Sequence, residues 1–278
     1  LILHALAKPG NGMWIEDPGF PLIRPIVTRH DVEILPVPVD DNGLDITSGI
    51  QNYPDARFAL ITPAHQSPLG VALSLARRHQ ILEWADRSQA WIIEDDYDSE
   101  FRYHGKPLPA LKSLDAPQRV IYAGTFSKAL FPALRCAWLV VPVKQIAQFR
   151  HQASLAPCAV PVLWQNTLAD FLREGHFWRH LKKMRQHYAQ RRQWIEQALT
   201  QQGFQVVPQK GGIQMVIRMI GDDIAHARKA NAAGLAVQAL SDWRIRSSGE
   251  GGLLLSFTNI VNEGMARQVA QQLRKALS

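Results

Sequence analysis

The sequence predicts an α/β protein with a mainly parallel sheet, followed by helices and a small α+β unit. Strands of the buried type alternate with helices from Met13 to about Pro142, which is typical of a parallel sheet covered by helices. The pattern then becomes helical from Val143 to about Gly203. From Gln214 onward the order is strand, helix, strand, helix, which predicts the α+β unit.

The elements of the first half are short and are separated by Pro/Gly turns. In order, we expect the end of a helix at Leu1 to Leu6 closed by Pro9-Gly10, a strand and turn at Trp14 to Phe20, a strand at Phe58 to Thr62 with a turn at Pro63 to Gly70, and a helix at Leu73 to Ser88.

The later elements follow in the same way. They are a strand at Trp91 to Ile93, a strand at Gln214 to Met219, a helix around Asp223 to Ala233, a strand at Gly252 to Phe257 and a terminal helix from Glu263. We therefore expect a large domain at 1–160, connecting helices at 161–200 and a small C-terminal domain at 201–278.

One lysine stands in an apolar stretch with hydroxyl residues and a downstream arginine, between Gly124 and Arg135. A lysine bonds to a carbonyl only as the free amine, which needs a dry pocket or cationic neighbours. Thr125 and Ser127 add hydroxyl donors next to Lys128. The guanidinium of Arg135 suits a phosphate group. The pattern predicts a Schiff-base site for a phosphorylated aldehyde; an isolated Ser-Lys pair is more often a solvated loop.

Acidic residues gather where the strand from Trp91 to Ile93 ends. In open α/β sheets the ligand crevice lies at the carboxyl ends of the strands, so a carboxylate that faces a cofactor belongs here. We assign this role to Asp95, since a pyridoxal phosphate enzyme needs a carboxylate opposite the pyridinium nitrogen. Tyr97, on the same side of an extended chain, can donate to the phenolic oxygen of the cofactor. The alternatives are a calcium or magnesium cluster and a solvated acidic loop.

These motifs, in this order, resemble the aspartate aminotransferase fold, which is fold type I of the pyridoxal phosphate (PLP) enzymes, and within it the MocR-type regulators. The resemblance covers nearly all of the chain. Its most specific parts are Glu94 to Tyr103, Arg119 to Arg135 and His180 to Arg192. In those regulators such a domain follows a winged helix-turn-helix of the GntR type and binds PLP to control transcription.

The resemblance implies a role for each motif residue. Lys128 would form the Schiff base with PLP, and Asp95 would pair with the pyridine nitrogen. Tyr97 would contact the ring oxygen, while Phe20 would stack on the ring. The residues that would hold the phosphate are Thr125, Ser127 and Arg135. No metal site is predicted.

The chain departs from the aminotransferase pattern at two places. Where those enzymes carry Asn-Pro-Thr-Gly, with the asparagine bonded to the ring oxygen, this chain has Ser67 followed by Pro-Leu-Gly. His65 or Gln66 would replace that contact, although a histidine in such a turn is as often structural. Leu254 stands where an arginine usually receives the substrate carboxylate. General transamination of α-amino acids is therefore not expected.

Arg244 and Arg246 lie just upstream of that strand and are candidates to replace the arginine, or else solvated loop residues. In the family a glycine-containing turn that binds the cofactor phosphate stands just before the position of Leu1. We therefore expect this chain to be the C-terminal piece of a longer protein, and expect the piece alone to bind PLP poorly.

The composition agrees with a cytoplasmic globular protein, since 278 residues with 46% hydrophobic content suffice for a large core. No apolar run approaches a membrane span, and no signal peptide is recognised. Cys136 and Cys158 do not imply a disulfide framework. Of the net charge of +7, part is concentrated from Arg173 to Arg192, where a solvated helix flank is favoured over a DNA contact.

Three functions remain open. The first is the PLP-binding effector and dimerisation domain of a MocR-type regulator, which would answer a small-molecule effector or amino compound, form a homodimer and contact DNA only through a module outside this chain. The second is an active PLP-dependent aminotransferase of class I/II. The third is a scaffold kept only for dimerisation, which the intact Lys128, Asp95, Tyr97 and Arg135 argue against.

Overall fold

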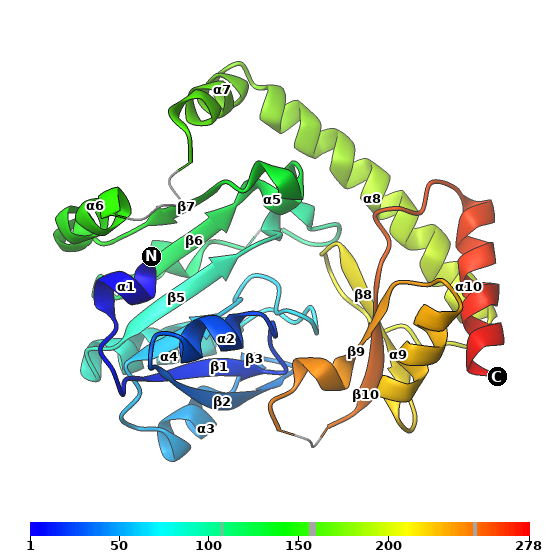
Figure 1. Cartoon of the computed structure of the whole chain (residues 1–278), viewed down its shortest axis with the longest axis horizontal. Coiled ribbons are helices and arrows are strands. Elements are labelled where there is room, and N and C mark those ends of the chain that lie inside the picture. Colours follow the sequence, from blue (N-terminus) through cyan, green and yellow to red (C-terminus); the bar gives the residue numbers. More distant parts are fainter. Residues whose placement is uncertain (107, 156–159, 247–248) are drawn as a thin grey trace.

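The computed structural model describes residues 1–278 except 107, 156–159 and 247–248 (Figure 1). Cys136 is buried and is not in a disulfide, whereas Cys158 lies outside the described residues. Among the described helices, none is both long and apolar enough to cross a membrane.

A seven-stranded sheet is built in the order β3-β2-β1-β4-β5-β6-β7. The inner pairings, from β2 to β6, are parallel, and the two edge strands β3 and β7 run antiparallel to their neighbours. The bounds are β1 Gly12–Asp17, β2 Glu33–Asp40, β3 Gly43–Leu44, β4 Phe58–Ile61, β5 Trp91–Asp96, β6 Val120–Thr125 and β7 Ala137–Val140. The expected mainly parallel sheet is confirmed.

Helices cover both faces of this sheet (Figure 1). Their bounds are α1 Ile2–Leu6, α2 Ile23–Thr28, α3 Ile46–Asn52, α4 Leu75–Arg87, α5 Phe126–Ala129 and α6 Ile146–Leu155. The helix expected at Leu73 to Ser88 is α4. It begins slightly later because the hydroxyl of Ser74 caps it, accepting from the N–H of Arg77.

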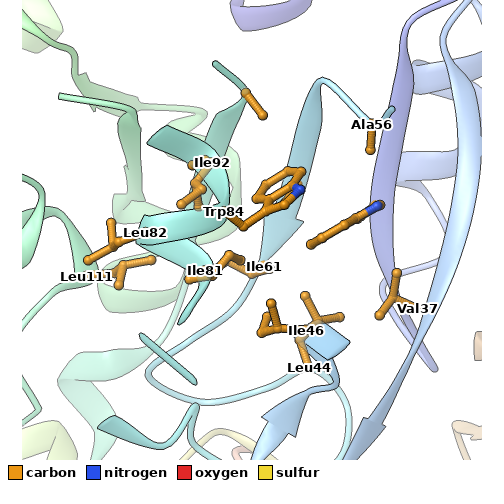
Figure 2. Close-up of a cluster of buried hydrophobic side chains, with 14 of the residues drawn as sticks. Val37, Leu44, Ile46, Ala56, Ile61, Ile81, Leu82, Trp84, Ile92 and Leu111 are labelled. Atoms are coloured by element: carbon orange, nitrogen blue, oxygen red, sulfur yellow. The ribbon is translucent and has the colours of Figure 1, made fainter. Parts of the chain in front are cut away.

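The main core lies between the sheet and helices α3 and α4 (Figure 2). Trp14 of β1 stacks on Trp84 of α4 with ring centroids 3.9 Å apart. Its neighbours Met13 and Ile15 point to the opposite face and pack with α1 and α2, because successive side chains of a strand alternate between faces. Burial on both faces explains why β1 has no alternating pattern in the sequence.

The part of the chain after α6 contains one antiparallel sheet and four α-helices among its described residues. A three-stranded sheet has the order β8-β10-β9, with bounds β8 Gln214–Met219, β9 Val237–Ala239 and β10 Gly251–Ser256. Its helices are α9 Asp223–Ala232 and α10 Glu263–Leu277, and α7 Val162–Arg173 and α8 His176–Gln201 precede it. The long α8 runs from the seven-stranded sheet to α10, against which it packs (Figure 1).

Asp17, at the end of β1, joins the two sheets. Its buried carboxylate accepts from the backbone N–H groups of Ile245 at 2.8 Å and Arg246 at 3.0 Å. Beside it, the N–H of Gly19 donates to the carbonyl of Trp243 at 3.0 Å. These bonds hold the segment before β10 against the carboxyl end of β1.

Candidate functional site

A cavity of about 470 Å³ opens where the carboxyl ends of the parallel strands face the three-stranded sheet. This volume lies within the range of small-molecule sites. The residues that line it are Ile15, Glu16, Gly19, Phe20, Pro21, Leu22, Ile23, Leu60, Thr62, Ser67, Asp95, Tyr97, Lys128, Ile213, Gln214, Gln238 and Trp243. Five residues that the sequence predicts for a cofactor are among them.

Lys128 enters the cavity from α5, the short helix that begins directly after β6. Thr125 starts this helix, because its hydroxyl accepts from the N–H of Ser127 at 3.1 Å. The same hydroxyl donates to the carbonyl of Cys136 at 3.4 Å. Thr125 and Ser127 therefore orient the turn that carries the lysine, and neither contributes to the described lining of the cavity.

Asp95 and Tyr97 reach the same cavity from the end of β5. Burial raises the pKa of Asp95 to about 6, and the neighbouring carboxylates of Asp96 and Asp98 add to the rise. At neutral pH the Asp95 carboxyl is thus mostly ionised and available to a cation. Burial, with the charge of Asp98, holds the pKa of Tyr97 well above its usual range, so its phenol remains a hydrogen-bond donor.

His65 stands behind Tyr97 and not in the cavity lining. Its Nδ1 lies 3.1 Å from the phenol oxygen of Tyr97 and 3.2 Å from a carboxylate oxygen of Asp98. With a proton on Nδ1, His65 donates to Asp98 and to the Tyr97 oxygen, and the phenol proton of Tyr97 stays free to donate elsewhere; without it, Nδ1 accepts that phenol proton, so the tautomer decides the role of Tyr97. His65 thereby acts on the orientation of Tyr97.

Phe20 and Ser67 complete the predicted set within the cavity. Phe20 is 47% exposed, and its ring lies 5.8 Å from that of Trp243, between centroids. Its open face suits a flat ring. Ser67 is buried, and its backbone N–H donates to the hydroxyl of Thr62 at 3.1 Å.

The acidic residues on either side of Asp95 accept hydrogen bonds from groups outside the cavity lining. Glu94 accepts from the N–H groups of Leu111 at 2.7 Å and Lys112 at 2.8 Å, and burial raises its pKa. Asp96 accepts from the hydroxyl of Tyr122 at 2.8 Å. In the described parts of the chain no group of His, Cys, Asp and Glu is arranged to hold a metal ion.

Glu16 is a cavity residue that the sequence motifs did not single out. It is buried, and its carboxylate accepts from the N–H of Thr62 at 3.1 Å, its hydroxyl at 2.6 Å and the side-chain amide of Gln66 at 3.2 Å. Burial raises the pKa of Glu16 to about 7 despite these bonds. Its position one residue before the end of β1 was the available signal, since the same rule located Asp95.

Gln66 ties this group to the turn that carries Phe20. Its amide nitrogen donates to the carbonyls of Pro18 at 2.9 Å and Ser67 at 2.8 Å, and its amide oxygen accepts from the N–H of Leu69 at 3.0 Å. Gln66 therefore holds the two turns in place from below the cavity and does not line it.

Arg135 lies outside the cavity. It is exposed, in a left-handed conformation with φ of 49°, and lines an adjoining apolar hollow of about 910 Å³. Ile23 and Leu60 border both spaces, so the two adjoin. The cavity thus brings together an amine, a carboxylate, a phenol and an aromatic ring. The residues predicted to bind the phosphate are not part of its described lining: Thr125, Ser127 and Arg135.

Comparison with known proteins identifies the family of this chain. Residues 1–249 match the model of the family described as aminotransferase class I and II. The chain belongs to this family.

Curated relatives include transcriptional regulators. The chain is 33% identical to the probable rhizopine catabolism regulatory protein MocR of Rhizobium meliloti over 282 residues, 99% of this chain and 56% of that protein. It is 31% identical to the HTH-type pyridoxine biosynthesis transcriptional regulator PdxR of Corynebacterium glutamicum over 279 residues, 100% of this chain and 60% of that protein. The chain therefore spans little more than half the length of these relatives.

Solved structures of family members show the same fold. The multiple substrate aminotransferase of Thermococcus profundus superposes with a TM-score of 0.88 at 25% identity, over 99% of this chain and 71% of that chain. The expected aspartate aminotransferase fold, with its α/β sheet, is confirmed.

The surroundings of Leu254, which the sequence resemblance assigns to the position of a substrate-binding arginine, are apolar. Leu254 is 3% exposed and packs with Val216, Leu240 and Trp243. The candidate replacements point elsewhere: Arg244 donates to the carbonyl of Glu250 at 3.0 Å, and Arg246 donates to the hydroxyl of Tyr53 at 2.8 Å. Neither contributes to the described lining of the cavity.

Proposed function

We propose that this chain is the PLP-binding effector and dimerisation domain of a MocR-type transcriptional regulator. The observation that carries the proposal is the convergence of Lys128, Asp95 and Tyr97 on one cavity beside the exposed ring of Phe20. An amine, a carboxylate, a phenol and a flat aromatic face match the aldehyde, the pyridine nitrogen, the ring oxygen and the ring of PLP. The residues present therefore fit this cofactor.

Each residue has a proposed task toward the cofactor. When bound, PLP supplies an aldehyde and an electron-withdrawing ring. Lys128 would hold the aldehyde covalently, and ionised Asp95 would keep the ring nitrogen protonated. Tyr97, oriented by His65, would donate to the ring oxygen, with Ser67 close to the same edge. Phe20 would cover one face of the ring.

The phosphate contacts are proposed with the help of neighbouring groups. Thr125 and Ser127 lie beside the lysine in sequence, and Arg135 borders the adjoining hollow. Because Arg135 is exposed, its side chain has the freedom to turn toward a phosphate at the border of the two spaces.

The regulator part of the proposal rests on the relatives. MocR and PdxR carry regulatory names and are longer than this chain. We infer that DNA is contacted through a module outside this chain, that a small amine is the effector, that the protein is a cytoplasmic homodimer, and that 1–160, 161–200 and 201–278 are its structural divisions. The two separate sheets support that division.

A working aminotransferase is the second candidate, because the same cavity holds a lysine amine that can move a proton between substrate atoms. The buried Leu254 disfavours this candidate for α-amino acids, since their carboxylate would lack its usual partner. An enzyme would release a keto acid or aldehyde from its amine, whereas a sensor would bind the amine without turnover.

The test is the visible absorbance of PLP mixed with the full-length protein. Lys128→Ala should abolish the band of the lysine-bound cofactor. Lys182→Ala, which removes an exposed lysine on α8, should leave the band intact. A band that persists in Lys128→Ala would refute the assignment.

A further inference from the structure

The cavity has two walls of different chemistry. The wall from the seven-stranded sheet carries the ionisable groups, including Glu16, Asp95 and Lys128. The opposite wall, which the three-stranded sheet and its flanking segments provide, consists of Ile213, Gln214, Gln238 and Trp243. Of the described residues, no arginine and no further lysine contributes to the lining. A ligand that extends from the lysine toward the second wall meets only neutral groups there.

The neutral wall is organised by a hydrogen bond between two of its members. The indole N–H of Trp243 donates to the amide oxygen of Gln238 at 2.9 Å. This bond fixes the orientation of the Gln238 amide, so its nitrogen is left as a donor with no partner among the described residues. Gln214, in the neighbouring strand β8, adds a second amide to the same wall.

The nearby cations are engaged in other bonds. Arg24 donates to the carbonyl of Trp243 at 2.6 Å, and Arg244 and Arg246 hold Glu250 and Tyr53 as described above. Trp243 itself is 4% exposed and packs on Leu254. The space that an arginine would need at this wall is therefore filled by an apolar cluster.

We propose that the site selects amines whose far end is an uncharged hydrogen-bond acceptor, such as a hydroxyl or carbonyl group, and discriminates against amines that carry a carboxylate. The proposal rests on the proposed function, because the amine is taken to meet cofactor held by Lys128. A carboxylate at the neutral wall loses part of its hydration to Trp243 and Ile213 without gaining a cation. A hydroxyl or carbonyl oxygen instead accepts from the amide nitrogen of Gln238.

The experiment titrates the full-length protein, loaded with PLP, with L-alanine and L-alaninol. These two amines share their carbon skeleton and differ in that a carboxylate is replaced by a hydroxymethyl group. Half-maximal change of the cofactor absorbance should need at least about tenfold less L-alaninol than L-alanine. Equal or tighter binding of L-alanine would overturn the proposal. If the proposed function itself is wrong, the result is different: the Lys128-dependent absorbance band of the cofactor is missing before any amine is added.

The variant Gln238→Arg tests whether the preference for L-alaninol over L-alanine can be reversed. Because Gln238 is exposed, an arginine there adds a cation to the wall without entering the core. We expect the preference for L-alaninol to shrink by about tenfold or to invert. Gln268→Arg, which adds the same charge to an exposed position of α10, should leave the preference unchanged. An equal response of both variants would contradict a role of the wall.

The donor itself is tested with isopropylamine, which is L-alaninol without its hydroxyl. The unmodified protein should bind L-alaninol about fivefold or more tighter than isopropylamine, because only the former accepts from Gln238. Gln238→Leu should remove this difference while the band of the bound cofactor remains. If the difference persists in Gln238→Leu, the amide of Gln238 is not the recognising group.

Discussion

The two walls of the cavity differ in how they are built. The charged wall consists of residues at or just after the ends of parallel strands, all of which belong to the seven-stranded sheet. The neutral wall is held against it by long-range bonds, such as those from the segment after Trp243 to Asp17. One wall thus supplies the ionisable groups that suit a cofactor, while the other is placed to choose what approaches it. The two are expected to respond differently to pH and substitution.

The largest difference concerns the pH dependence of stability. In the folded protein the pKa of Glu16 is raised from 4.5 to about 7. The contribution of this shift to the free energy of unfolding is therefore fully present below pH 4.5 and is lost as the pH rises through about 7. This amounts to at most about 3 kcal/mol. The free energy of unfolding in urea should be lower at pH 8 than at pH 5. Glu16→Gln should make this decline smaller without removing it, because Asp95 also has a raised pKa.

Glu83→Gln is the control for this measurement, since Glu83 is an exposed carboxylate on α4. It should retain the decline of the unmodified protein between the two pH values. Equal flattening in both variants would show that the buried carboxylate of the charged wall is not responsible.

The second prediction concerns Asp95 and the cofactor. Asp95→Asn keeps the shape of the side chain but removes the charge that would face the ring nitrogen. Hydrogen bonds to charged groups contribute about 1.5–3 kcal/mol, so PLP should bind about tenfold to a hundredfold more weakly. Equilibrium dialysis of PLP measures this. Asp242→Asn, in the 3-10 helix Leu240–Trp243 beside the neutral wall, is the matched control and should change the affinity little.

The third prediction tests the connection between the walls. Asp17→Asn replaces one of two carboxylate acceptors by an amide donor that faces the N–H of Ile245 or Arg246. A buried group left without a partner costs about 1–3 kcal/mol, which urea unfolding should detect. The selectivity between L-alanine and L-alaninol should fall at the same time. Unchanged stability would mean that the junction depends on other contacts.

The smallest effect is expected at Trp243. Trp243→Phe keeps the apolar contact with Leu254 and loses the indole donor to Gln238. The loss of one neutral hydrogen bond costs about 1 kcal/mol of stability, and the freed amide of Gln238 should discriminate less between L-alaninol and isopropylamine. A variant with unchanged discrimination would show that the orientation of Gln238 does not depend on Trp243.

Much of the charged wall was predictable from local sequence. Asp95 stands near the end of β5, Tyr97 follows that strand and Lys128 follows β6, and the ends of parallel strands meet at one edge of a sheet. Glu16 obeys the same rule but was missed, because its neighbours indicated only a turn and a stacking aromatic. The hydroxyl of Thr125, which we expect to contact phosphate, also caps α5, a local use of such side chains that the motif did not indicate.

The sequence by itself determined the alternation of strands and helices, the mainly parallel sheet and the edge at which the amine and carboxylate meet, since these follow from short-range periodicity and chain direction. Only the tertiary structure decided that Trp243 and Gln238 form the opposite wall, that Arg135 borders a separate hollow, and that Arg244 and Arg246 turn away from the cavity. The physical reason is distance along the chain: Asp17 and Ile245 are brought together by the packing of two sheets, which no local pattern records.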